Sequence, residues 1–214
     1  MALVPVAVAQ AVNGRLRLIP AWPVYLISAL PFLWLVWQGF DGGMGADPVK
    51  FLEKHVGKFA LIFLIIGLCV TPVRRLTGIS LIKYRRAIGL AAFAYVALHF
   101  SIWLVLDIAL RWGEIWADIV KRPYITIGMI GLLAMVPLAV TSNNLSVRRM
   151  GATAWTKLHR LTYLAAFAGA LHYLILVKAW PIKVIIYFTI VVALLLVRVW
   201  WSWQRQRSRA LAGA

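Results

Sequence analysis

Apolar runs that approach 20 residues recur along most of the chain. An α-helix rises about 1.5 Å per residue, so about 20 apolar residues are needed to cross the hydrocarbon core of a bilayer. The chain of 214 residues is 63% hydrophobic and only 14% charged, which is too apolar for an ordinary soluble domain. The sequence therefore predicts an all-α, polytopic membrane protein.

The apolar runs predict a bundle of six transmembrane helices. The expected spans cover residues 20–39, 57–73, 87–107, 124–141, 159–178 and 182–203. The predicted organisation is a cytoplasmic N-terminal segment over 1–19, the six-span domain over 20–203 and a basic cytoplasmic tail over 204–214. We expect no separate soluble domain, because the connecting segments are too short to form one.

Charge is divided unevenly between the two sides of these spans. One side carries basic residues and no acid: Arg15, Arg17, Arg74, Arg75, Lys83, Arg85, Arg86, Arg148, Arg149, Lys157, Arg160, Arg198, Arg205, Arg207 and Arg209. The other side carries all six acids: Asp41, Asp47, Glu53, Asp107, Glu114 and Asp118. Loops rich in lysine and arginine face the cytoplasm, so both termini are expected there. This topology accounts for the net charge of +17, and we expect membrane lipid rather than nucleic acid around the chain.

Two histidines, His99 and His172, lie deep within different predicted spans. Imidazole is costly to bury in hydrocarbon unless it has a partner. His99 lies ~18 Å and His172 ~19.5 Å from the inner end of its span, so the two reach nearly the same depth. Two such imidazoles can ligate one haem iron from opposite sides, and the small residues before them, in GLAAFA and LAAFAGA, leave space for the ring. We predict a b-type haem, because the chain has no C-x-x-C-H; the alternative is hydrogen bonding across a helix interface.

A third histidine, His159, lies at the predicted inner membrane boundary. It precedes His172 by 13 positions, a rotation of about 220° in an ideal helix, so the two do not share a face. At that depth the third span offers Arg85 and Arg86 and no histidine. Three alternatives follow for His159: ligation of a second haem with an unusual partner, a flavin or quinone site, or an interfacial position without a cofactor.

The remaining reactive residues carry weaker signals. His55 is predicted to be interfacial, and the single cysteine, Cys69, is predicted to be a small buried hydrophobe that cannot form an intrachain disulfide. The sequence contains no dinucleotide-binding glycine motif and no P-loop. Reducing equivalents must therefore come from another molecule or from a small bound carrier.

A series of short segments in order along the chain points to a family. They are PFLWLVW (31–37), GADPVK (45–50), RRAIGL (85–90), KRPYITIG (121–128), TSN (141–143), WTKLHRLTYLA (155–165) and LHYL (171–174). With them the chain closely resembles the MsrQ (YedZ) family, the haem-binding membrane subunits of bacterial methionine sulfoxide reductase systems. More broadly, it is similar to the ferric-reductase transmembrane domain shared with NADPH oxidases.

The resemblance implies an electron-transfer cytochrome b subunit, multi-pass in the bacterial inner membrane, whose catalytic centre is on a partner. That partner would be a periplasmic molybdopterin reductase, similar to MsrP, that repairs oxidised proteins by reducing methionine sulfoxide. The electron donor would be the quinone pool or a cytoplasmic flavin reductase. The family is described with haem b and FMN, and its motif histidines fall on His99, His159 and His172.

The chain departs from the wider group at one position. Members of that group carry two histidines on the third span, whereas here Arg85 and Arg86 occupy the inner position. This difference favours another inner carrier, such as FMN, over a second bis-histidine haem.

Two other functions are compatible with such a bundle. One is a quinol-linked cytochrome b that serves another periplasmic oxidoreductase. The other is a non-redox transporter or scaffold whose histidines pack or relay protons. The absorption spectrum of the purified protein separates the last class, because only the haem-binding alternatives predict a reducible b-type spectrum.

Overall fold

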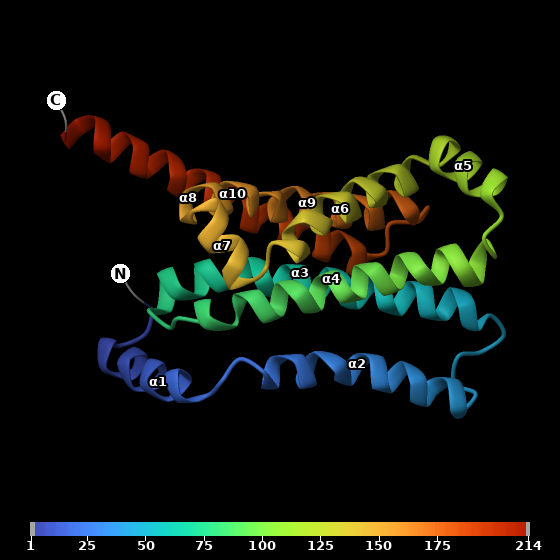
Figure 1. Cartoon of the computed structure of the whole chain (residues 1–214), viewed down its shortest axis with the longest axis horizontal. Helices are drawn as coiled ribbons and strands as arrows, with labels where there is room; N and C mark the ends of the chain where they lie inside the picture. The colour runs from blue at the N-terminus through green and yellow to red at the C-terminus, as the bar shows by residue number, and fades with distance from the viewer. Residues whose placement is uncertain (1–2, 213–214) are drawn as a thin grey trace.

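The computed structural model describes residues 3–212 and is all-helical over that range, as the sequence predicts (Figure 1). The outermost residues of the predicted N-terminal segment and basic tail, 1–2 and 213–214, lie outside the described part, as does the side chain of Arg209. The elements are α1 (Val6–Leu18), α2 (Pro23–Phe40), α3 (Pro48–Thr77), the 3₁₀-helix η1 (Ile82–Tyr84), α4 (Arg85–Ser101), the π-helix η2 (Ile102–Asp107), α5 (Trp112–Lys121), α6 (Pro123–Val140), α7 (Asn144–Met150), α8 (Ala152–Leu158), α9 (Leu161–Leu176) and α10 (Ile182–Ala212).

Within residues 3–212, five helical segments are long and apolar enough to cross a membrane. They are Pro23–Phe40, Pro48–Thr77, Ile82–Asp107, Pro123–Val140 and Ile182–Ser208. The chain is therefore a multi-pass membrane protein. The predicted span over 159–178 corresponds to α9, which has 16 residues and a length of about 24 Å, and so falls short of that criterion. The six-span topology with cytoplasmic termini stays a prediction.

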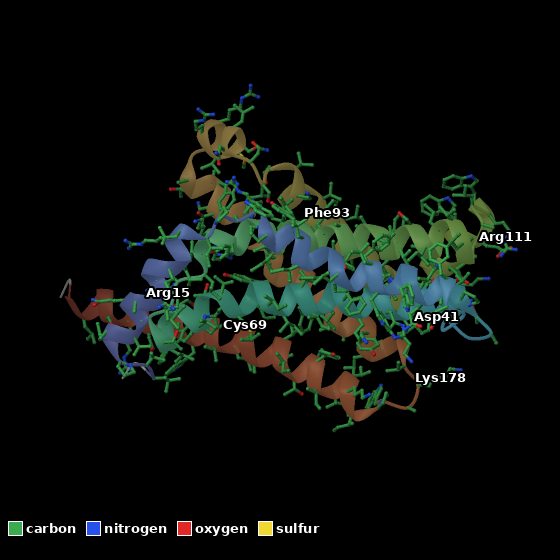
Figure 2. All side chains as sticks on the ribbon, turned by 90° about the horizontal axis from the view of Figure 1, so that it is seen from below. Arg15, Asp41, Cys69, Phe93, Arg111 and Lys178 are labelled. Atoms are coloured by element: carbon green, nitrogen blue, oxygen red, sulfur yellow. The ribbon has the colours of Figure 1, made fainter. Side chains whose placement is uncertain are left out.

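The long helices run side by side along the bundle. Both termini lie at one end and α5 lies at the other (Figure 1). In Figure 2, Arg15 lies toward the end that holds the termini, and Asp41, Arg111 and Lys178 lie at the opposite end. Arg15 and Asp41 therefore lie at opposite ends of the bundle, and which end faces the cytoplasm stays a prediction.

The core forms where α3 packs against α4, and where α6 and α10 pack against α9. Leu64 and Leu68 of α3 contact a cluster that includes Ala92 of α4, Ala166 of α9 and Val191 of α10. Alanine at these positions lets the helix backbones approach closely, which is how helices associate in a membrane without a hydrophobic driving force between them. One core cluster therefore contains residues of both α4 and α9, the helices of the two deep histidines.

The predicted N-terminal segment contains a helix that packs against the end of α3. Gly78 ends α3 in the left-handed conformation, with φ 77°. The side chain of Asn13 on α1 donates to the Gly78 carbonyl at 3.0 Å and accepts from the Ser80 amide at 2.8 Å. One amide side chain thus satisfies backbone groups on both sides of this turn.

Prolines inside two of the spans leave backbone groups that side chains of neighbouring helices satisfy. In α2, near Pro31, the hydroxyl of Tyr95 accepts from the Phe32 amide at 3.0 Å and donates to the Ser28 carbonyl at 2.7 Å. Tyr95 belongs to α4, so this hydroxyl joins α4 to α2 beside Pro31. Such partners are what make proline tolerable in a membrane helix.

Arg198 has the same role for α3. Pro72 cannot donate a hydrogen bond to the carbonyl of Leu68, four residues earlier. Nη2 of Arg198 on α10 donates to that carbonyl, and Nη1 donates to Leu194 O at 2.9 Å. The guanidinium also lies over the Tyr163 ring, 5.4 Å from its centroid. Arg198, which the charge pattern counts with the basic end, therefore reaches between helices of the bundle.

We expect Arg198→Leu to lower the thermal unfolding temperature in detergent, because the Leu68 carbonyl loses its donor and an unsatisfied buried acceptor costs about 1–3 kcal/mol. Adding Pro72→Ala should recover part of the loss, because alanine restores an amide hydrogen four residues after Leu68. Pro72→Ala in the native background is the control. Equal unfolding temperatures for Arg198→Leu and the native protein would show that this contact contributes nothing.

Candidate functional site

The structure brings His99 and His172 together. His99 lies near the end of α4, and His172 lies on α9. Their ring centroids are 6.1 Å apart, with an interplanar angle of 78°. Both side chains line a cavity of about 1200 Å³ that α3, α4, α6, α9 and α10 enclose. Equal depth along two helices thus becomes direct proximity once the helices pack.

Backbone carbonyls set the tautomer of both rings. Nδ1 of His99 is 3.0 Å from the carbonyl oxygen of Glu53, and Nδ1 of His172 is 2.6 Å from that of Tyr124. A carbonyl oxygen only accepts, so each Nδ1 carries the proton and each Nε2 keeps a lone pair. This is the arrangement of a metal-ligating histidine, whose other nitrogen donates to a partner that orients the ring. Glu53 and Tyr124 act through backbone atoms, which no sequence motif identifies.

The separation of the rings suits a single iron atom. An imidazole nitrogen lies about 2 Å from a first-row metal ion, so two rings on opposite sides of one iron have centroids roughly 6 Å apart. The observed distance is 6.1 Å. The pair is therefore spaced as two ligands of one iron would be, and its residues would suit the b-type haem that the sequence predicts.

Two glycines let helix backbones pass close to the imidazoles. A Cβ atom on Gly57 of α3 would lie 3.0 Å from Cε1 of His99, and one on Gly128 of α6 would lie 2.9 Å from Nδ1 of His172. Both positions line the cavity. The sequence analysis missed them, because it considered only the small residues that precede each histidine. A glycine within an apolar span was the available signal.

The cavity has apolar walls and charged groups among its lining residues. The walls include Leu61, Leu64, Val96, Met135 and Ala165. The charged residues, which we call the outer rim, are Lys50, Glu53, Lys54, Lys58, Asp107, Arg122 and Lys183. An apolar interior next to an excess of cations suits a flat apolar group that carries carboxylates, as haem does. The sequence placed these charges on the outer side of the bundle and did not connect them with the histidines.

His159 lies apart from this pair. Its Nε2 is 3.2 Å from Oγ1 of Thr141, which itself donates to the Pro137 carbonyl at 2.6 Å. The single hydroxyl proton is therefore used, so Nε2–H of His159 is the donor and, in the neutral ring, Nδ1 keeps a lone pair. The ring stacks on Trp155 with centroids 3.7 Å apart. His159 does not line the large cavity.

A second, smaller hollow lies between the basic start of α4 and α7. Arg86, Asn144, Val147 and Arg148 line it, and its volume is about 440 Å³. Arg86 donates to Oδ1 of Asn144 at 2.8 Å. Two guanidinium groups beside an amide form a donor set that suits an anion.

The other two candidates have local partners. His55 places Nδ1 2.8 Å from the Phe51 carbonyl and stacks on the Phe51 ring at 4.1 Å. It is partly buried and lines the large cavity, so its predicted interfacial position holds only in part. Cys69 is a free, partly buried thiol, in agreement with its predicted packing role.

Comparison with known proteins identifies a family. Residues 55–170 match the family described as "Ferric reductase like transmembrane component". The protein named "Protein-methionine-sulfoxide reductase heme-binding subunit MsrQ" from Brucella ovis is 50% identical over 190 residues, which cover 89% of this chain and 86% of the relative. Proteins of the same name from Brucella canis and Brucella abortus match with the same identity and coverage. The resemblance seen in the sequence is confirmed: the chain belongs to the MsrQ family and carries a ferric-reductase-like transmembrane domain.

Proposed function

We propose that the chain is a transmembrane electron-transfer cytochrome b that holds one haem b between His99 and His172. The observation that carries this proposal is the imidazole pair, whose rings lie 6.1 Å apart with both Nδ1 atoms engaged by backbone carbonyls. Haem, when bound, supplies a one-electron carrier. A membrane electron-transfer role also agrees with the family to which the chain belongs.

The residues of the chain do the binding, orienting and shielding. Nε2 of each histidine would be the ligand, and the carbonyls of Glu53 and Tyr124 hold the rings in the required tautomer. The apolar cavity walls exclude water from the site. Lys58 and Lys183, two lysines of the outer rim, would neutralise the carboxylates of the haem. None of these groups is placed to act on an organic substrate, so the catalytic centre belongs to a partner.

We place the partner on the periplasmic side of the bacterial inner membrane. It is a molybdopterin reductase, similar to MsrP, that reduces methionine sulfoxide in oxidised proteins. The relatives' printed name, which refers to methionine sulfoxide reductase, supports this choice. In the proposed topology α9 is the fifth of six spans and both termini are cytoplasmic. His99 then lies toward the outer end of α4, close to the partner.

The inner side needs a further carrier in this scheme. Arg85, at the inner end of α4, precedes His99 by a helix length of about 21 Å, and electron tunnelling weakens steeply with distance. We propose FMN as this carrier, with its phosphate in the hollow lined by Arg86 and Arg148. His159, which follows the end of α8, belongs to the same proposed inner side. The donor is a quinone or a cytoplasmic flavin reductase.

The test is purification in mild detergent, identification of every bound chromophore, and reduction by a flavin donor followed by reoxidation with the periplasmic reductase. We expect a reducible b-type spectrum together with a flavin or a quinone. His159→Ala should keep the haem of the His99–His172 pair and slow its reduction by the donor. The proposal is wrong if the native protein carries no haem, and the inner site is misplaced if His159→Ala loses all haem.

A further inference from the structure

GADPVK (45–50), one of the short segments by which the chain resembles its family, leads into the start of α3 at the outer end of the bundle. Oδ1 of Asp47 accepts a hydrogen bond from the Lys50 amide at 3.0 Å, and Pro48 occupies the first helical position. Asp47 is the N-cap of α3, and the ring of Pro48 holds φ near the helical value. The first turn of α3 is therefore well defined. The backbone of Lys50 is therefore held in one place.

The ammonium group of Lys50 joins two helices. Nζ lies 2.9 Å from Oε2 of Glu53, on the next turn of α3, and 2.9 Å from Oδ1 of Asp107, the last residue of η2. The Glu53 and Asp107 side chains are 16% and 27% exposed, so both carboxylates are partly shielded from solvent. One cation thus neutralises two carboxylates that would otherwise repel each other across the α3–η2 contact.

The same three residues connect directly to His99. The backbone carbonyl of Glu53 accepts the hydrogen bond from Nδ1 of His99 at 3.0 Å. Asp107 ends the helical segment that continues from His99 through η2. Lys50 therefore ties the residue that orients the imidazole to the segment that carries it.

The segment after His99 has an irregular backbone, which a contact with another helix can hold in place. A π-helix is a rare departure from α-helical geometry that occurs mostly at functional sites. Beyond η2, Ala109 and Leu110 have positive φ values of 52° and 58°, which are costly for residues with a Cβ. Local backbone preferences therefore do not fix the path of the chain after His99. The contact between Asp107 and Lys50 constrains this segment from another helix.

We propose that Lys50 is a positioning residue for the His99 ligand: it sets the orientation of that imidazole through Glu53 and Asp107. This inference rests on the proposed haem site. Without the ammonium group, the two carboxylates repel, the start of α3 separates from η2, and the Glu53 carbonyl moves relative to Nδ1. The imidazole plane of His99 then turns relative to that of His172. The EPR g-values of a low-spin ferric haem report the mutual orientation of its two imidazole planes.

The experiment compares Lys50→Met, Lys50→Arg and Lys54→Met in the full-length haem-loaded protein. Lys54 lies one turn further along α3, lines the same cavity, and makes no ion pair within residues 3–212. Lys54→Met therefore removes the same charge from the same rim. We expect shifted g-values and faster haem loss in Lys50→Met, near-native values in Lys50→Arg, and unshifted g-values in Lys54→Met. The proposal would be overturned if Lys50→Met and Lys54→Met gave the same g-values and the same rate of haem loss.

Two further variants complete the test. If Lys50→Met fails to insert, Asp107→Asn removes one arm of the bridge and keeps the ion pair between Lys50 and Glu53; unshifted g-values in that variant also overturn the proposal. His99→Ala separates this inference from the proposed function. Full haem retention in His99→Ala refutes the haem site itself, whereas haem loss there together with a native Lys50→Met spectrum refutes only the role of Lys50.

Discussion

Replacing His99 or His172 with alanine is expected to remove nearly all haem from a protein that still inserts in the membrane. Each substitution deletes one of the two histidines proposed to hold the haem, and the remaining imidazole alone would not hold the iron in the same low-spin state. The two side chains line the cavity and do not belong to the main core cluster. We therefore expect the bundle to keep its packing between α3, α4 and α9. Haem per protein, measured on the purified variants, gives the result directly.

The matched control for these variants is His55→Ala. His55 also lines the cavity, and its Nδ1 also bonds a backbone carbonyl, at 2.8 Å from Phe51 O. Its ring, however, is stacked on Phe51 and is not paired with a second imidazole within the described residues. We expect His55→Ala to keep the native haem content and spectrum. If His99→Ala and His172→Ala also kept them, the ligands would lie elsewhere.

Gly128→Ala is expected to weaken haem binding at least about tenfold, equivalent to about 1.4 kcal/mol. The new Cβ would lie 2.9 Å from Nδ1 of His172, closer than real Cβ contacts allow. The ring cannot retreat without losing its 2.6 Å hydrogen bond to the Tyr124 carbonyl. The methyl group therefore displaces the ligand or breaks the contact that orients it. Transfer of haem to an excess of a soluble haem-binding protein measures the change in dissociation.

The control for this variant is Gly169→Ala, in the same cavity. There the nearest atom to the new Cβ is Cδ1 of Leu64 at 3.7 Å, an ordinary contact. Alanine favours a helix over glycine by up to about 1 kcal/mol, so neither variant should lose helix stability. Equal haem dissociation from the two variants would show that the close approach of α6 to His172 is unimportant.

Features that depend on distance along the chain were predictable from the sequence. The apolar runs identified the helical class, and five of the six predicted spans correspond to helices long enough to cross a membrane. The matched depth of His99 and His172 followed from a fixed rise per residue. The ordered short segments identified the MsrQ family, which the comparisons confirm.

The tertiary structure decided what lies beside each residue. Depth along a helix says nothing about its rotation or its neighbours, which packing between helices sets. Only the packed bundle shows that the two imidazoles meet and that the carbonyls of Glu53 and Tyr124 orient them. The same holds for the Arg198 guanidinium on the carbonyl that Pro72 leaves free, and for the Lys50 bridge between two helices. These contacts join residues far apart in the sequence, so no local pattern of residues could encode them.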